Sequence, residues 1–170
     1  EKEPFRIAVN TVLKENDIPW IITDGVMIKI DEKQFEQDLK RKALEQLHEL
    51  TDSAPVFQSA YDELIKAIEF LEKDNYAEAV TNAGKSYESV MKIICGADRG
   101  NADALTQKIL SDNHVTLPAA MNGNGFREKV LMALPFIRNN SAAHGAGMNS
   151  EDLTRPLANL AVNLAAVLDT

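Results

Sequence analysis

The feature that most constrains the fold is a pair of apolar stripes between residues 56 and 95. In segments 56–73 and 76–95, apolar residues recur three or four positions apart, which is the period of a helix with one buried face. Asp74 and Asn75 alone separate the two segments, and a connection this short joins antiparallel neighbours. The pattern therefore predicts an antiparallel helix hairpin within a mainly α protein.

Further helices are expected around this hairpin, at residues 32–50, 103–112, 126–143 and 151–169. The last of them is apolar nearly all round, so it is either central or shared with another subunit. Pro135 is expected to kink the helix over 126–143. The side chains expected to anchor that helix are Val130, Leu131, Leu134, Phe136 and Ile137. The Asn-Gly-Asn-Gly segment at 122–125 is expected to be flexible.

The first fifty residues predict a separate, smaller module. A short helix is expected over residues 4–16, followed by two β-rich runs at 20–23 and 26–30. Asp24-Gly25 between the runs is the type of dipeptide that favours a type I′ hairpin turn. We therefore expect two parts: residues 1–52, with a helix, a β-hairpin and a connecting helix, and residues 53–170, with the helical bundle.

Polar side chains that could bind a ligand or transfer protons are concentrated just before Gly145 and Gly147. Arg138, Asn139, Asn140, Ser141 and His144 fall within seven residues. Arginine can hold a phosphate in a fixed fork, asparagine can orient it, and histidine exchanges protons near neutral pH. The combination predicts chemistry on a phosphodiester. The alternative is a helix C-terminus, where Arg and His would face the negative end of the helix dipole.

The spacing of Arg138 and His144 sets a geometric condition on such a site. On a straight helix, residues six positions apart stand ~9 Å apart along the axis and ~120° apart around it. The two side chains therefore cannot both reach one small ligand from an ideal helix. The helix can end before His144, the long arginine side chain can sweep back, or a second subunit can contribute one of the two residues.

The same residues carry a resemblance to a known family. Arg138-Asn139, four further residues and His144-Gly145 resemble the R-N-x4-H signature of the HEPN superfamily, and RNNSAAHG-x-G is similar to the version in the C-terminal domain of abortive-infection (Abi-type) proteins. The segment 85–95 resembles the family's earlier helix, and the resemblance extends from about Ser53 to the end. It implies a HEPN-like helical bundle that pairs into a homodimer, with the two motifs facing each other across a groove.

A polar stripe on the second helix of the hairpin is open to two interpretations. Thr81, Lys85, Glu88 and Lys92 are three or four positions apart and so share one face. They can form a solvent-exposed face stabilised by Lys–Glu pairs. Alternatively, as the family resemblance suggests, Glu88 reaches Arg138 or His144 and orients it, and Lys92 supplies positive charge for a phosphate.

The resemblance implies, for the active members, a metal-independent endoribonuclease, and we expect one of a phage-defence or toxin-type system. His144 would act as general acid or base during attack of the ribose 2′-hydroxyl, and Arg138 would hold the scissile phosphate. Asn139 would orient the phosphate or the motif backbone, and Glu88 would position Arg138. The expected substrate-binding residues are Lys85, Lys92, Asn140 and Ser141. The alternative is a non-catalytic dimeric module that binds a partner protein or a nucleotide through the same groove.

Charge and composition limit the partners further. A net charge of −8 argues against broad nucleic-acid binding, although a local positive patch on an acidic body would still admit single-stranded RNA. No cofactor, metal or membrane contact is expected. The single cysteine, Cys95, and the lack of an export signal or membrane-spanning run predict a cytoplasmic location. Because the chain opens on Glu1 rather than Met, we expect it to be a fragment, with a further domain or regulatory region upstream.

Overall fold

The computed structural model describes residues 2–16, 18, 20–23, 25–29, 32–141 and 153–169. These residues belong to two compact units, Glu1–Asp38 and Leu39–Thr170. The division falls within the connecting helix, so the C-terminal part of that helix packs with the bundle. The predicted boundary between residues 52 and 53 stays a prediction.

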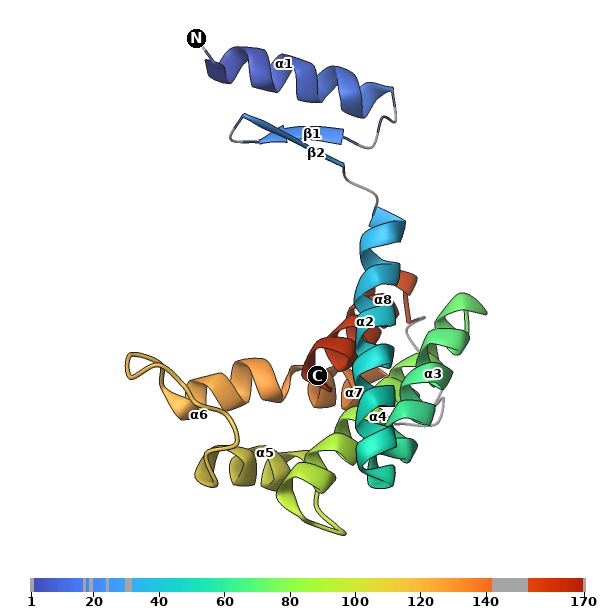
Figure 1. Cartoon of the computed structure of the whole chain (residues 1–170), viewed down its shortest axis with the longest axis vertical. Helices are drawn as coiled ribbons and strands as arrows, with labels where there is room; N and C mark the ends of the chain where they lie inside the picture. The colour runs from blue at the N-terminus through green and yellow to red at the C-terminus, as the bar shows by residue number, and fades with distance from the viewer. Residues whose placement is uncertain are drawn as a thin grey trace. The chain divides into compact units, whose positions relative to one another are not determined.

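The N-terminal unit is a helix packed on a two-stranded antiparallel sheet. Helix α1 (Lys2–Glu15) lies along β1 (Trp20–Thr23), and β1 pairs with β2 (Val26–Lys29) (Figure 1). Gly25 has a φ of +76°, which a type I′ turn requires of its central residues. The Asn10 side chain accepts a hydrogen bond from Ile22 N at 2.8 Å and donates one to Ile22 O at 2.9 Å. This exchange ties α1 to the hairpin, and the predicted helix and hairpin are confirmed.

The second unit is a helical bundle, as the mainly α prediction required. In Figure 1, α3 (Gln58–Glu72) and α4 (Tyr76–Cys95) lie side by side, as the short Asp74-Asn75 turn predicts. Within the described ranges, no helix combines the length and the apolar character needed to cross a membrane. The elements are α2 (Glu32–Ser53), η1 (Pro55–Phe57), α3 (Gln58–Glu72), α4 (Tyr76–Cys95), α5 (Ala102–Ser111), α6 (Gly123–Phe126), η2 (Arg127–Leu131), α7 (Ala133–Ser141) and α8 (Arg155–Leu168).

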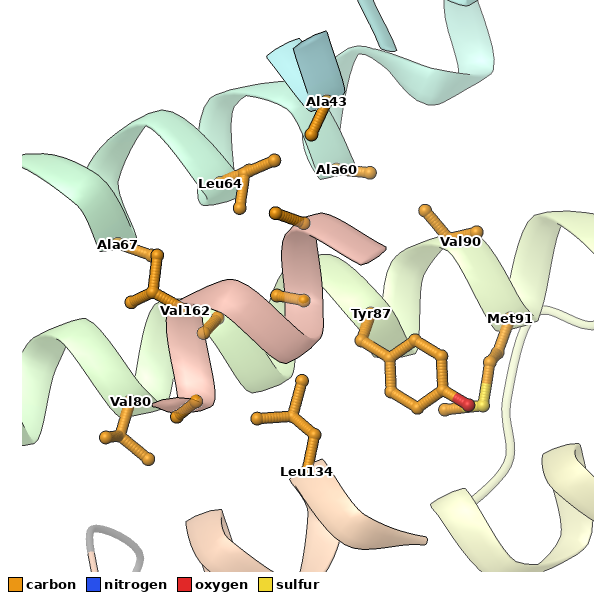
Figure 2. Packing of buried hydrophobic residues seen from close by; sticks show 14 of the residues in the cluster. Ala43, Ala60, Leu64, Ala67, Val80, Tyr87, Val90, Met91, Leu134 and Val162 are labelled. Atoms are coloured by element: carbon orange, nitrogen blue, oxygen red, sulfur yellow. The ribbon is translucent and has the colours of Figure 1, made fainter. Parts of the chain in front are cut away.

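Helix α4 lies at the centre of the bundle, in contact with α3, α5, α7 and α8. Figure 2 shows Leu64 of α3, Leu134 of α7 and Val162 of α8 in one buried cluster with Val80 and Tyr87 of α4. Small residues on α4 let the neighbouring backbones approach closely. The buried residues of α4 are Ala79, Val80, Asn82, Ala83, Gly84, Ser86, Tyr87, Val90, Met91 and Cys95.

The helical run before Arg138 differs from the expected single helix over 126–143. Residues 123–125, expected to be flexible, instead begin α6, because the Asn122 side chain accepts hydrogen bonds from the N–H groups of the first turn. A π-helical turn, η2, follows, and the run breaks at Met132. Pro135 then lies in the first turn of α7, where its missing N–H costs no helical hydrogen bond.

A buried carboxyl group closes the bundle after the last helix. Asp169, 3% exposed, lies with its Oδ2 2.6 Å from Ser86 Oγ, which is also 2.8 Å from Ala60 O. A hydroxyl has one proton, so both contacts are satisfied when a protonated Asp169 donates to Ser86 and Ser86 donates to Ala60. Burial raises the pKa of Asp169 to about 7; the Ser86 hydrogen bond lowers it and the Glu63 charge on α3 raises it. Burial also raises the pKa of Tyr87, and the nearby Asp169 carboxylate raises it further.

Replacement of this carboxyl by an amide should change how stability depends on pH. The folded chain keeps the Asp169 proton up to pH about 7, whereas the unfolded chain releases it near its ordinary pKa of 3.8. The parent should therefore lose stability as pH rises from about 4 to about 7. Asp169→Asn should lack this loss and exceed the parent at pH 8 by up to about 4 kcal/mol, measured by urea unfolding from pH 4 to 8. Exposed Asp52→Asn is the control, and equal slopes in the parent and Asp169→Asn would contradict the assignment.

Candidate functional site

Three of the predicted site residues, Arg138, Glu88 and Lys92, meet where α7 crosses α4. Arg138 Nη1 on α7 donates to Glu88 Oε2 on α4 at 3.1 Å, and Lys92 Nζ lies 2.7 Å from the other carboxylate oxygen. The three side chains are each about 30% exposed. One carboxylate therefore holds two cations, and the group carries a net positive charge. Glu88 thus forms a pair within its own helix and also contacts Arg138, so each interpretation of the polar stripe has one of its contacts, and the role of Glu88 stays a prediction.

A cavity of about 300 Å³ opens beside this ion pair. Its volume is at the lower end of the range for small-ligand sites in proteins. One of the five Arg138 N–H groups donates to Glu88, and no other acceptor for them lies within hydrogen-bonding distance in the described part of the chain. A guanidinium has further donors that can bind an anionic group in a fixed fork. The lining residues are Gly84, Glu88, Met91, Gly100, Asn101, Ala102, Pro135, Arg138 and Asn139.

The other predicted site residues are placed less directly. Lys85 is exposed, and the described residues offer it no ion-pair partner. Asn140 Nδ2 donates to Phe136 O at 2.7 Å, and Ser141 Oγ donates to Ile137 O, so both side chains bind the carbonyls of their own helix. His144 lies outside the described residues. The roles expected of these four residues stay predictions, as do the catalytic and binding roles expected of Glu88, Lys92, Arg138 and Asn139.

A second and larger cavity, of about 650 Å³, lies between η2–α7 and α8. Apolar side chains of Met132, Phe136, Ile137, Leu160 and Leu164 form most of its lining. Asn139 lines this cavity and the smaller one, so the two adjoin at the motif.

Phe136 was expected to be buried and is instead 67% exposed. Leu134 and Phe136 are two positions apart and so point to opposite sides of a helix; Leu134 takes the buried side. This spacing is the signal that sequence reasoning missed. On the other side of the apolar cavity, Leu160 of α8 is also 49% exposed, so the exposed apolar surface spans two helices.

Comparison with protein families gives a match that covers most of the bundle. The family model for the HEPN-like domain Abi_C matches residues 58–168, which include α3–α8, Glu88 and the whole R-N-x4-H motif. Neither the search of curated proteins nor the search of solved structures returned a match. The matched region contains both partners of the Arg138–Glu88 contact.

Removal of the Glu88 charge should destabilise the bundle measurably. Glu88→Gln leaves Arg138 and Lys92 without their shared carboxylate in a partly buried setting, so the free energy of unfolding should fall by about 1–2 kcal/mol. The matched control is Glu69→Gln, which breaks an exposed pair with Lys73 at the same i,i+4 spacing and should change stability by less than about 0.5 kcal/mol. Urea unfolding at pH 7 measures the free energy of unfolding of both variants. An equal decrease in the two would show that the Glu88 contacts stabilise the fold no more than an exposed ion pair does.

Proposed function

Since the chain belongs to the HEPN-like Abi_C family, we propose that it is a metal-independent endoribonuclease of a phage-defence or toxin-type system. The observation that carries the proposal is Arg138, held by Glu88 at 3.1 Å on the wall of a cavity that Asn139 also lines. A guanidinium fixed in this way, which has further donors, suits the recognition of a phosphate.

In the proposed reaction, the ribose 2′-oxygen attacks the adjacent phosphorus and the bond from phosphorus to the 5′-oxygen breaks. His144 exchanges the protons, either taking one from the 2′-hydroxyl or giving one to the leaving oxygen. Arg138 stabilises the negative charge that develops on the phosphate oxygens. Asn139 orients the phosphate from the same cavity, and Glu88 reduces the number of conformations open to Arg138 before RNA binds.

The charges around the cavity support an RNA substrate despite the acidic chain. Arg138 and Lys92 outnumber Glu88, and Lys85 lies exposed one turn before Glu88 on α4. Arg127 contributes less, because Asp103 and Glu128 both lie within ion-pair distance of it. A small positive region on a chain of net charge −8 favours accessible single strands, since tight duplex binding requires many phosphate contacts.

The apolar cavity beside the motif supports a homodimer as the active form. Phe136 of α7 and Leu160 of α8 are exposed and line this cavity. In a monomer their apolar side chains contact water, whereas a second subunit would bury them. A two-fold dimer uses the same surface on both subunits. Because Asn139 lines this cavity and the Arg138 cavity, a second copy seated here would bring its own motif next to the first and form one composite site.

Cleavage of a fluorescent single-stranded RNA in EDTA tests the proposal. The parent should cleave, Arg138→Ala should lose about 100-fold or more in rate, and His144→Ala should lose roughly 100- to 10,000-fold. His114→Ala, at a half-exposed histidine after α5, is the control and should match the parent. If a folded parent is inert on several RNAs, the non-catalytic binding module becomes the better reading; in that case His144→Asn or His144→Gln should leave binding intact.

Substitution on the apolar surface tests the dimer separately. Phe136→Asp places a charge in the proposed interface and should convert the protein to monomer in sedimentation experiments, with RNA cleavage falling in parallel. Val56→Asp is the matched control, because Val56 is also exposed, at 59%, but lies in η1, away from the motif helix. A Phe136→Asp protein that keeps the oligomeric state of the parent would exclude this surface as the interface.

A further inference from the structure

Helix α4 carries a buried glycine in its middle, Gly84. Glycine at such a position destabilises a helix by ~1 kcal/mol relative to alanine. The backbone conformation at position 84 does not require glycine, since the glycines with a positive φ in the described part of the chain are Gly25 and Gly96. A reason for Gly84 must therefore come from its neighbours.

The neighbour is the side chain of Arg138. A Cβ atom at position 84 would lie well inside van der Waals contact of Arg138 Cδ and 3.3 Å from both Cγ and Nε. The aliphatic part of Arg138 thus rests directly on the bare backbone of α4. The helical glycines Gly123 and Gly125 differ, because a Cβ there would meet nothing closer than 4.0 Å.

One turn further along α4, Glu88 holds the guanidinium of the same arginine. An added methyl group at 84 would push the middle of the side chain away by about 1 Å, given ordinary carbon–carbon contact distances. The 3.1 Å contact between Arg138 Nη1 and Glu88 cannot absorb such a shift and remain a good hydrogen bond. The absence of a side chain at Gly84 and the carboxylate of Glu88 therefore both determine where the Arg138 side chain lies.

We propose that Gly84 is a positioning residue that leaves room for Arg138 to lie across α4 and present its guanidinium to the cavity. Its role in cleavage rests on the proposed ribonuclease function, whereas its effect on the Arg138 conformation does not. Gly84 also lines the cavity, so a larger side chain would narrow the space for a phosphate as well as displace the arginine.

A double-mutant cycle tests the positioning role without any RNA. Gly84→Ala should lower the urea midpoint in the parent, because Arg138 must leave its place. In an Arg138→Ala background the same substitution should raise the midpoint, because the clash is gone and alanine favours the helix. Gly125→Ala, the control, should shift the midpoint equally in both backgrounds. Equal shifts for Gly84→Ala in both backgrounds would overturn the proposal. If Gly84→Ala alone does not fold, restored folding in the double variant would support it, and continued failure to fold would overturn it.

A kinetic measurement then separates positioning from stability. At a temperature where all variants are folded, Gly84→Ala should lower kcat at least tenfold, and Gly125→Ala should leave it unchanged. Unchanged kcat in a folded Gly84→Ala protein would overturn the positioning role. An inert parent would instead contradict the ribonuclease function, and the cycle would still decide whether Gly84 positions Arg138.

Discussion

The burial of α4 is the constraint on which the rest of the bundle depends. The helices α3, α5, α7 and α8 all contact it, so the residues on its buried faces are mostly small or apolar. The buried hydroxyl of Ser86 is hydrogen-bonded to Ala60 and Asp169. Glu88 and Lys92, on the polar stripe of α4, are only half-buried. There α7 approaches α4 with Arg138, whose positive charge pairs with the carboxylate of Glu88. A partly buried carboxylate with two cationic partners avoids the penalty that an unpaired charge would face in the same place.

The break before α7 decides which side chains face α4. A π-helical turn adds residues to one turn, so it changes the rotation of everything that follows relative to an uninterrupted α-helix. After the break at Met132, Leu134 points into the core, Arg138 reaches Glu88, and Phe136 points to the exposed side. The same rotation therefore produces both the paired arginine and the exposed apolar surface. Chemistry and subunit pairing, as proposed, have one structural origin.

The sequence predicts those features of the fold that depend on neighbouring residues, namely helices with a regular apolar stripe and tight turns. Helical periodicity identified α3 and α4, and Asp24-Gly25 identified the hairpin. Residues 122–125 were misjudged because Asn-Gly repeats suit both a flexible loop and a capped helix start, and the Asn122 hydrogen bonds decide between them. The Glu88–Arg138 contact joins residues 50 positions apart. The sequence of α4 alone does not predict this contact, because a polar stripe has the same pattern whether water or another helix covers it.

The fixed arginine also bears on how the motif can act. Three arrangements could bring Arg138 and His144 to one ligand, and one of them required the arginine side chain to sweep back along its own helix. With its stem on Gly84 and its guanidinium on Glu88, that side chain is committed to α4 instead. In the proposed mechanism His144 must therefore reach the phosphate at the position where Arg138 is held on α4. It can do so within one subunit if the helix ends before His144, or from the second copy across the apolar surface of α7 and α8. The dimer variant Phe136→Asp distinguishes these two routes, because an active monomer is possible in the first and excluded in the second.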